Sequence, residues 1–357
     1  MKEAKAAVAP FELEFVDVHW HTVYGVKQHV AARMQDRERI LLAGDAAHTH
    51  SSGTAQGMNT GVHDAVNLGW RLAGVINGWY KPEVLSNYSD ERRATAQQLI
   101  ANDRLISALI TGKKPGKYAD RTESVVEILD EVMDDQRSFT VGLGIEYSDS
   151  IVNDVKNSYP PIAQIPGQRA PDFNLYKNGF TRTPIRLYEV TKYNGKFHLL
   201  VFAGVARDTR PQLERLRSQV DKLAGPYEHV LAFRTIIAGT GRAFAEHLGI
   251  KSQFGDAYWD VDHRAHEQYK IAEDVGALVV LRPDGIQGFV APLDGFDKVV
   301  QYLSRIANPR EAKKVASNGV NGHIGEMINL DENNLYYQQA KDQGSVSGVE
   351  EGHVASG

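Results

Sequence analysis

The chain has 357 residues, enough for one large or two ordinary domains with buried cores, and contains no cysteine. Without cysteine, disulfides, thiolate metal sites and cysteine nucleophiles are excluded. Its 40 basic and 45 acidic residues give a net charge of -5, which argues against nucleic acid or an anionic membrane as the main partner. The N-terminus lacks an apolar signal segment, and no apolar run approaches the roughly 20 residues of a membrane helix. We therefore expect a cytoplasmic protein.

Two segments near the N-terminus have the alternating apolar and polar residues of half-buried strands, residues 11–18 and residues 24–30. A buried apolar strand is predicted over residues 40–43, which read Ile-Leu-Leu-Ala and lead into Gly44-Asp45. At the end of such a strand, the carboxylate of Asp45 can accept hydrogen bonds from ligand hydroxyls.

A loop of small residues follows, and then a long amphipathic helix from about Gly57 to about residue 77. Its apolar residues near one face are Val62, Val66, Ala73 and Ile76. Glycine at the start of a helix lets a ligand approach the backbone, where free amides favour negative charge. The alternative interpretation is a strand–loop–helix corner that binds no ligand.

A second long helix is predicted over about residues 83–109, with a Tyr-x-x-Glu-Arg sequence at 88–92. We interpret this sequence as an intrahelical charge pair combined with core packing. Residues 113–166 form a connection with helical sequence around 125–133. Prolines at 160, 161 and 166, followed by Gly167, indicate a boundary.

Beyond residue 171, short apolar strands alternate with amphipathic helices. The predicted elements are strands at 197–203, 228–237, 277–281 and 287–291 and helices at 211–223, 242–248 and 296–306. The sequence Arg-Pro-Asp-Gly at 282–285 suits a type I turn between the last two strands. Two βα units followed by a hairpin and a helix describe a thioredoxin-like domain. Without cysteine, this domain can have no thiol redox role and is structural.

Two further patterns have weaker support. The sequence Gly-Thr-Gly-Arg-Ala-Phe-Ala at 239–245, with Asp260 about 20 residues later, superficially fits a dinucleotide-binding fingerprint. Its third small residue is at the wrong spacing, so an ordinary helix start explains it better. Histidine pairs at 19 and 21, 48 and 50, and 263 and 266 lack a convincing third ligand, so we predict no metal site. Packing and hydrogen bonding explain the pair at 48 and 50 better.

The stretch from residue 40 to residue 72 resembles the second flavin-binding motif of the FAD-dependent aromatic hydroxylases, most closely of the phenol hydroxylase branch. The family motif has Gly-Asp-Ala-x-His at a strand end, then Gly-Gln-Gly-Met-Asn, and Asp-x-x-Asn-Leu-x-Trp-Lys-Leu within the helix. The matching residues are Gly44, Asp45, Ala46, His48, Gln56, Gly57, Met58, Asn59, Asp64, Asn67, Leu68, Trp70 and Leu72. The Tyr-x-x-Glu-Arg sequence and residues 167–172 also resemble the family pattern.

This resemblance implies a mixed α/β, or α+β, architecture. Residues 1–112 would form part of an FAD-binding and substrate domain, residues 113–166 a helical connection, and residues 167–308 a thioredoxin-like domain that contributes to a homodimer. Residues 309–357 are polar and are expected to form a mostly disordered tail.

The resemblance also implies FAD as cofactor, NADPH as reductant, and molecular oxygen, with which a flavin C4a-hydroperoxide hydroxylates a small phenolic substrate. Asp45 would hold the ribityl chain, and the amides that open the helix would lie near the flavin N1–C2=O edge. Tyr24 could line the substrate pocket. The residues implied in flavin binding are Gly44, Asp45, Ser52, Gln56, Gly57, Met58 and Asn59.

The chain departs from the family pattern in the motif and at its front. Ser52 stands where proline is usual and Ala55 where glycine is usual, which should loosen the loop and hinder close backbone approach. His29 replaces a common arginine. No Gly-x-Gly-x-x-Gly follows an N-terminal strand, so the N-terminal dinucleotide-binding half is expected to be absent.

Three explanations of this expected absence remain open. The chain is an incomplete form of a longer enzyme, or it pairs with a separate chain that supplies the missing half, or it is a relic that only dimerises. Two functional hypotheses follow. One is an FAD-dependent aromatic monooxygenase represented by its C-terminal portion, and the other is a non-catalytic dimerisation protein without flavin.

Overall fold

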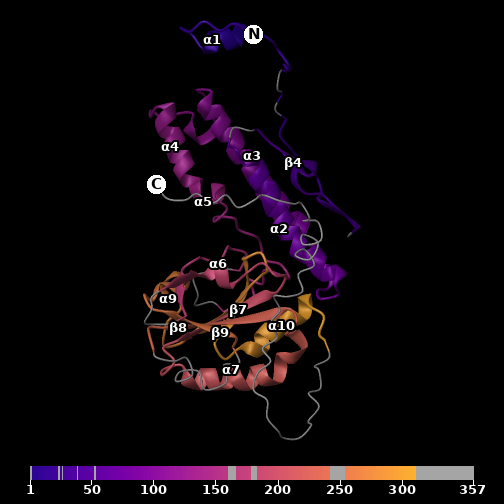
Figure 1. The fold of residues 1–357 in the computed structure, drawn as a ribbon, viewed down its shortest axis with the longest axis vertical. Coiled ribbons are helices and arrows are strands. Elements are labelled where there is room, and N and C mark those ends of the chain that lie inside the picture. Colours follow the sequence, from indigo (N-terminus) through magenta and orange to yellow (C-terminus); the bar gives the residue numbers. More distant parts are fainter. Residues whose placement is uncertain are drawn as a thin grey trace, which may run out of the picture. The chain divides into compact units, whose positions relative to one another are not determined.

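The computed structural model describes residues 2–22, 25, 27–37, 39–51, 54–159, 166–177, 183–241 and 254–310 (Figure 1). Residues 1–312 belong to one compact unit, and residues 313–357 to a second that lies outside the described residues. The predicted helix at 242–248 and most of the predicted tail are likewise outside the described part of the chain.

The N-terminal residues have little regular structure. Helix α1 (Lys2–Ala7) precedes residues 11–22, which form no strand, so the strand predicted at 11–18 is wrong. Phe11, Val16 and Trp20 of this segment are largely exposed. The alternating pattern is therefore present, but no described sheet covers its apolar side, and an extended segment gains little stability without a paired strand.

Two short antiparallel ribbons follow. Strand β1 (His29–Val30) pairs with β4 (His48–Thr49), and β2 (Gln35–Asp36) pairs with β3 (Ile40–Leu41). The strand predicted at 40–43 is thus only two residues long, and its first residue is 59% exposed. The prediction of a buried strand was wrong because a two-stranded ribbon leaves one of its faces open. The 3-10 turn η1 (Gly44–Ala46) comes next.

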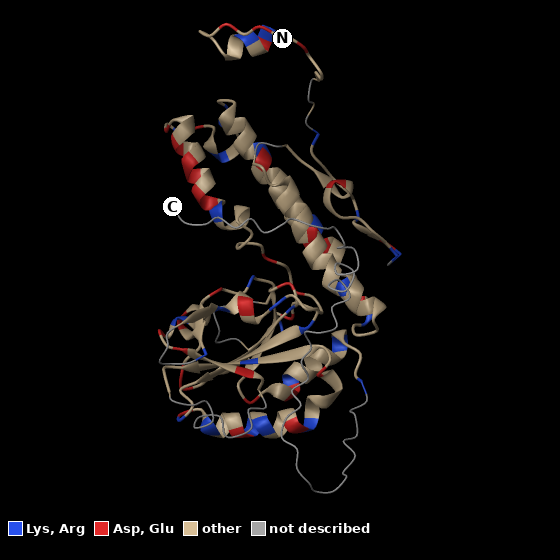
Figure 2. Ribbon diagram, in the orientation of Figure 1, with Lys and Arg blue, Asp and Glu red and all other residues tan. Residues whose placement is uncertain are grey.

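The long helices begin near the predicted positions. Helix α2 (Gly57–Ile76) starts at the predicted glycine, whereas α3 (Tyr88–Ile110) starts later than predicted because η2 (Pro82–Leu85) forms a separate 3-10 turn. After η3 (Gly116–Tyr118), helix α4 (Val125–Asp135) opens with a capping box and presents the row of acidic residues visible in Figure 2. Its apolar side packs on α3, and the short α5 (Arg137–Thr140) follows it.

Helix α2 buries its polar side. Asp64, Asn67 and Arg71 are buried, whereas Val62 and Ile76, predicted on the apolar face, are 53% and 74% exposed. The pattern was correctly seen as amphipathic, but the polar face is the one packed against the rest of the described chain. Burial of these polar groups is possible because each finds charged or amide partners.

The second half of the chain forms a seven-stranded mixed sheet in the order β11-β10-β7-β8-β9-β5-β6. Strands β7, β8 and β9 are parallel and the other pairings antiparallel. The strands are β5 (Asn174–Tyr176), β6 (Pro184–Arg186), β7 (Phe197–Gly204), β8 (Leu231–Ala238), β9 (Asp256–Asp260), β10 (Ala277–Leu281) and β11 (Gln287–Pro292).

Helices cover both faces of this sheet. Helices α7 (Arg210–Leu223) and α10 (Phe296–Ile306) lie on one face, and α6 (Leu187–Val190) and α9 (Arg264–Tyr269) on the other (Figure 1). A 3-10 turn, η4 (Gly225–Tyr227), links α7 to β8. The predicted strand–helix–strand order, hairpin and final helix are confirmed, whereas β5, β6 and β9 and their helices were missed because they are short.

The C-terminal half of α2 packs against the sheet. Three aromatic rings meet edge to face, with centroids 5.5 to 5.6 Å apart. They belong to Trp70 of α2, to Tyr80 shortly after α2, and to Phe197 of β7. Gly74 makes this contact possible, because a Cβ there would lie 1.9 Å from the Tyr80 ring. The two regions of the described chain therefore share an aromatic core.

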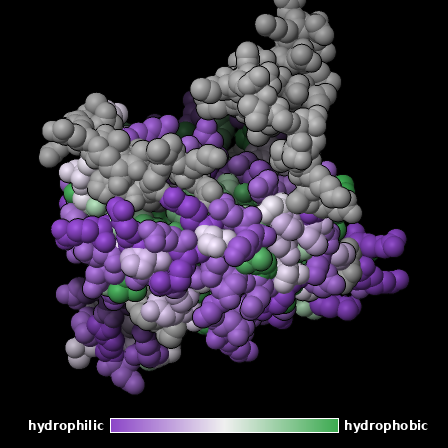
Figure 3. Space-filling view, turned by 90° about the horizontal axis from the view of Figure 1, so that it is seen from below, coloured by the Kyte–Doolittle hydropathy of each residue, from purple (hydrophilic) through white to green (hydrophobic). Residues whose placement is uncertain are grey.

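The surface seen from the side of α7 is mostly hydrophilic, with apolar residues scattered between polar ones (Figure 3). Within the described part of the chain, no helix combines the length and apolar character required to cross a membrane.

Candidate functional site

An open cleft of about 640 Å³ borders the start of α2. This volume is in the range of small-molecule sites, roughly 300 to 1,000 Å³. Three of the residues implied in flavin binding line it, namely Asp45, Gly57 and Met58. Its lining also includes Gly25, Lys27, His29, Thr49, His50, Ser51 and Ala55.

The turn η1 presents Asp45 to the cleft. Gly44 adopts a left-handed backbone conformation, with φ +59°, and its amide donates to Asp64 Oδ2 at 2.8 Å. A Cβ on Gly61 of α2 would lie 3.6 Å from the Gly44 Cα, so the turn packs closely against the helix. Asp45 itself is exposed, and its carboxylate is therefore available to a ligand in the cleft.

The N-terminus of α2 forms another part of the cleft wall. The side chain of Gln56, which precedes the helix, makes no capping hydrogen bond, and the first turn has no acidic residue. The first amides of a helix have no intrahelical acceptor and carry a partial positive charge. A Cβ on Gly57 would meet only the His50 ring, at 3.6 Å. The backbone is thus accessible and electrostatically suited to an anionic or electron-rich group.

The loop before α2 is strained at Ala55. This residue lines the cleft and has a φ of +53°, a conformation that residues with a Cβ rarely adopt. It is also the position where the aromatic hydroxylases usually have glycine. The departure noted in the sequence therefore falls on a residue whose backbone conformation favours glycine.

The remaining residues implied in flavin binding lie around the cleft or outside the described chain. Gly44, Gln56 and Asn59 flank the cleft without lining it. Ser52 and Tyr24 are not among the described residues. The sequence analysis did not assign Lys27, His29 or His50 to the site. Lys27 and His29 precede the motif and reach the cleft only in the fold, and His50 is not one of the residues that match the family pattern.

Asp103 of α3 holds Ser51, which lines the cleft. This buried carboxylate accepts hydrogen bonds from the Ser51 backbone amide at 3.1 Å and the Ser51 hydroxyl at 2.7 Å. The Gln28 side chain donates to the same carboxylate. A residue remote in sequence therefore holds the loop that follows β4.

Asp64 of α2 is buried behind the turn and has three donors. Besides the Gly44 amide, it accepts from Arg92 Nε at 2.6 Å and lies 2.7 Å from His48 Nε2. Burial raises the pKa of Asp64, but His48 and Arg92 outweigh it and the net pKa is lowered. The carboxylate is therefore ionised at neutral pH. Hydrogen bonding and packing account for His48, as predicted.

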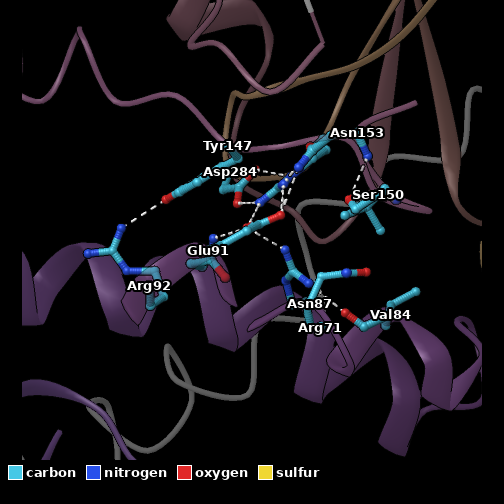
Figure 4. A network of polar contacts seen from close by, with 12 residues as sticks. Arg71, Val84, Asn87, Glu91, Arg92, Tyr147, Ser150, Asn153 and Asp284 are labelled. Atoms are coloured by element: carbon cyan, nitrogen blue, oxygen red, sulfur yellow. Dashed lines mark hydrogen bonds and ion pairs between the residues drawn. The ribbon is translucent and has the colours of Figure 1, made fainter. Parts of the chain in front are cut away.

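A second buried network surrounds Glu91 of α3 (Figure 4). Its carboxylate accepts from Arg71 at 2.7 Å, Arg282 at 2.8 and 3.2 Å, Asn67 at 2.8 Å and Asn153 at 2.8 Å. Burial raises the pKa of Glu91, but Arg282 and Arg71 outweigh burial and lower this pKa to about 2. The predicted intrahelical charge pair at 88–92 is therefore wrong, because both charged residues pair with other elements.

The hairpin turn of the sheet contributes to this network. Arg282, which follows β10, binds Asp284 and Asn153 as well as Glu91. The Trp70 indole donates to Asp284 Oδ2 at 3.1 Å. Residues 282–285 thus connect the sheet domain to α2 and α3, a role that the turn prediction did not include.

His266 and Asp260 form a buried pair within the sheet domain. His266 lies 2.7 Å from Asp260, which also accepts the Ala265 and His266 amides at the start of α9. Asp260 is thus hydrogen-bonded within its own domain. Among the described residues, no three histidine or acidic side chains are grouped so that they could hold a metal ion.

Two known protein families match this chain, one toward each of its ends. Residues 2–103 match the family "FAD binding domain", and residues 242–311 match "Phenol hydroxylase, C-terminal dimerisation domain". The first match argues against the expectation that the FAD-binding half is absent, because it begins at residue 2 of the chain.

Individual proteins similar to this chain are named as monooxygenases. The chain is 31% identical over 335 residues to phenol 2-monooxygenase fsqG of Aspergillus fumigatus, covering 87% of this chain and 55% of that protein. It is 29% identical over 332 residues to the FAD-dependent monooxygenase ankC of Aspergillus thermomutatus, covering 86% and 53%. The chain therefore spans about half the length of these relatives.

The fold resembles a solved flavoprotein. The crystal structure of the flavin-dependent monooxygenase PieE in complex with FAD and substrate superposes with a TM-score of 0.56 at 20% identity, covering 79% of this chain and 49% of that one. Because the two sequences have diverged so far, this likeness concerns the fold alone. The family matches and the relatives show that the chain is similar to FAD-dependent aromatic monooxygenases over about half of their length.

Proposed function

We propose that the chain binds FAD in the cleft at the start of α2 and takes part in the hydroxylation of a phenolic substrate. One observation carries this proposal: an exposed carboxylate, Asp45, and a helix N-terminus without acidic residues or a side-chain cap border the same cleft. The carboxylate suits ligand hydroxyls, and the helix N-terminus suits negative charge. A flavin with its ribityl chain carries both kinds of group.

The residues present fit this cofactor. Asp45 would accept hydrogen bonds from the ribityl hydroxyls, and the amides of Gly57, Met58 and Asn59 would face the flavin edge that becomes negative on reduction. A helix N-terminus stabilises such charge by about 0.3 to 2 kcal/mol. Bound FAD would supply the electron transfer and oxygen chemistry, while the protein supplies binding and electrostatics.

The other groups around the cleft have secondary roles in this proposal. Gly44 gives the turn its shape, Gln56 leads into the helix, and Ser52 stands between them in the sequence. Tyr24 would line the substrate pocket. Lys27 lines the cleft, and its ammonium group would add positive charge beside the reduced flavin or a phenolate.

The relatives support the reaction class. Their names describe a phenol 2-monooxygenase and FAD-dependent monooxygenases. We extend this activity to the present chain, with NADPH as reductant and molecular oxygen and a small aromatic compound as substrates.

The sheet domain would form a homodimer, as the matched dimerisation family suggests. The order β7-α7-β8, then the β10–β11 hairpin and α10, supports a thioredoxin-like fold for residues 167–308. The preceding parts would be an FAD-binding and substrate portion at 1–112 and a helical connection at 113–166.

Titration of the purified chain with FAD, followed by flavin fluorescence and visible circular dichroism, tests cofactor binding. Wild type should bind, and Asp45→Ala should lose detectable retention of FAD. Gly57→Ala should also weaken binding, yet it should stabilise the protein slightly, because alanine favours a helix by about 0.5 to 1 kcal/mol over glycine. This opposite change in stability separates a ligand effect from a folding defect.

Asp130→Ala is the matched control, because Asp130 is exposed on α4. It should leave FAD affinity unchanged. Colourless wild-type protein that elutes as a dimer and ignores added FAD would instead favour the non-catalytic dimerisation protein.

A further inference from the structure

Asp64 shapes the cleft without lining it. Its side chain is fully buried, and one of its oxygens, Oδ2, holds both the Gly44 amide and the His48 ring. Gly44 begins the turn that presents Asp45. The position of the Asp45 carboxylate therefore depends on a buried charge that a ligand in the cleft does not touch.

The charge of Asp64 is balanced by Arg92, which leads away from the cleft. Arg92 Nε binds Asp64 Oδ1 at 2.6 Å, and Arg92 Nη1 donates to the Tyr147 hydroxyl at 2.8 Å. Both charged side chains are fully buried. Figure 4 shows the guanidinium of Arg92 directed toward the Tyr147 hydroxyl. Removing one member of such a pair is costly, because the other charge is left buried and uncompensated.

Tyr147 in turn contacts the sheet domain. The guanidinium of Arg282 lies over the Tyr147 ring, 5.4 Å from its centroid. Arg282 is fully buried and is held by Glu91 and Asp284. A continuous series of described side chains thus runs from the turn at Gly44 to the hairpin turn of the sheet domain.

We propose that Asp64 is a positioning residue for the flavin cleft, and that Arg92 and Tyr147 connect it to Arg282, so that the sheet domain sets flavin affinity. This inference rests on the proposed function, because it assumes that FAD occupies the cleft. It adds that the sheet domain, matched only to dimerisation, also acts on the cofactor site. Double-mutant cycles measure the coupling between these residues.

The sharpest variant is Tyr147→Phe, which removes a single hydroxyl and retains the ring beneath Arg282. The dissociation constant for FAD should rise about fivefold, the lower end of typical coupling between sites. The visible circular dichroism of the bound flavin should change as well, because the turn that bears Asp45 relaxes. Asp64→Asn should raise the dissociation constant more than tenfold, since an amide cannot accept all three hydrogen bonds.

Tyr188→Phe is the matched control, because the Tyr188 hydroxyl donates to the Ala170 carbonyl within the sheet domain. It should change neither the affinity nor the flavin spectrum. Combining Asp64→Asn with Tyr147→Phe should give less than the product of the two single effects, because both act on one series of contacts. Arg282→Lys retains the charge but loses the planar guanidinium. It should raise the dissociation constant for FAD by a factor between those of Tyr147→Phe and Asp64→Asn.

The outcomes separate this inference from the proposed function. Wild-type protein that binds no FAD would refute the proposed function, and the same cycle measured on unfolding free energy would then test the contact series by itself. If wild type binds FAD but Tyr147→Phe behaves like Tyr188→Phe in affinity and spectrum, the inference is overturned. Independent, multiplicative effects of Asp64→Asn and Tyr147→Phe would overturn it too.

Discussion

All eight residues of β7 are buried, most of them against apolar side chains, whereas the buried face of α2 carries Asp64, Asn67 and Arg71. The sheet domain is thus stabilised mainly by apolar burial, which is proportional to area and has little directional requirement. The helical region relies more on buried ion pairs, which need every partner in place. The buried ion pairs therefore give the region around the cleft a defined geometry, although its apolar clusters are small.

This difference also predicts how substitutions in each region should affect the stability of the protein. Removing one apolar side chain leaves a cavity whose cost depends on local relaxation. Removing one charge from a network leaves its partners buried and uncompensated.

Glu91→Gln should have the largest effect on stability. The substitution keeps the shape of the side chain but leaves Arg71 and Arg282 without the anion that both contact. Breaking a buried ion pair in this way costs about 3 to 5 kcal/mol. Urea unfolding at neutral pH measures the loss. Glu83→Gln, at an exposed position of η2, serves as control and should change stability by less than about 0.5 kcal/mol.

The pH dependence gives a second test of the same network. Because the folded-state pKa of Glu91 is about 2, below its ordinary value of 4.5, its contribution is fully present above pH 4.5. It should decrease as the pH falls from 4.5 toward 2. Wild type should therefore lose its stability advantage over Glu91→Gln across this interval. An advantage that stays constant down to pH 2 would contradict the assigned network.

Leu199→Ala tests the apolar region. Leu199 lies in β7 and is fully buried in the main core cluster, so its truncation should cost about 3 kcal/mol. Unlike Glu91→Gln, the loss should be nearly the same at pH 3 and pH 7, since no charge is involved. Leu72→Ala, at an exposed site of α2 that is 38% accessible, should cost much less. A strong pH dependence of the Leu199→Ala effect would remove the contrast between the regions.

The same contrast explains what the sequence could predict. Apolar periodicity located β7, β10, β11, α7 and α10, because burial in the sheet domain follows the hydrophobic pattern. For α2, the same periodicity predicted the wrong buried face, because the polar face is the buried one. Partners such as Arg282 and Glu91, separated by 191 positions, leave no local pattern.

The candidate site was partly predictable for a related reason. Asp45 and Gly57 belong to one contiguous motif, and both line the cleft. Lys27 was not assigned because it precedes the motif, and Ser51 was not assigned because it falls between the residues that match the family pattern. The supporting carboxylates Asp64 and Asp103 are buried in helices, where neither their partners nor their burial could be inferred from spacing.

The smallest predicted effect concerns the strained loop beside the cleft. At Ala55, with φ +53°, a side chain costs roughly 1 to 2 kcal/mol, while glycine loses about 0.4 to 1 kcal/mol through unfolded-state entropy. Ala55→Gly should therefore stabilise the protein by about 0.5 to 1 kcal/mol in urea unfolding. Ala65→Gly, exposed within α2, should destabilise it by a similar amount. If both variants destabilise equally, Ala55 is not strained, and the usual glycine there serves only the approach of the ligand.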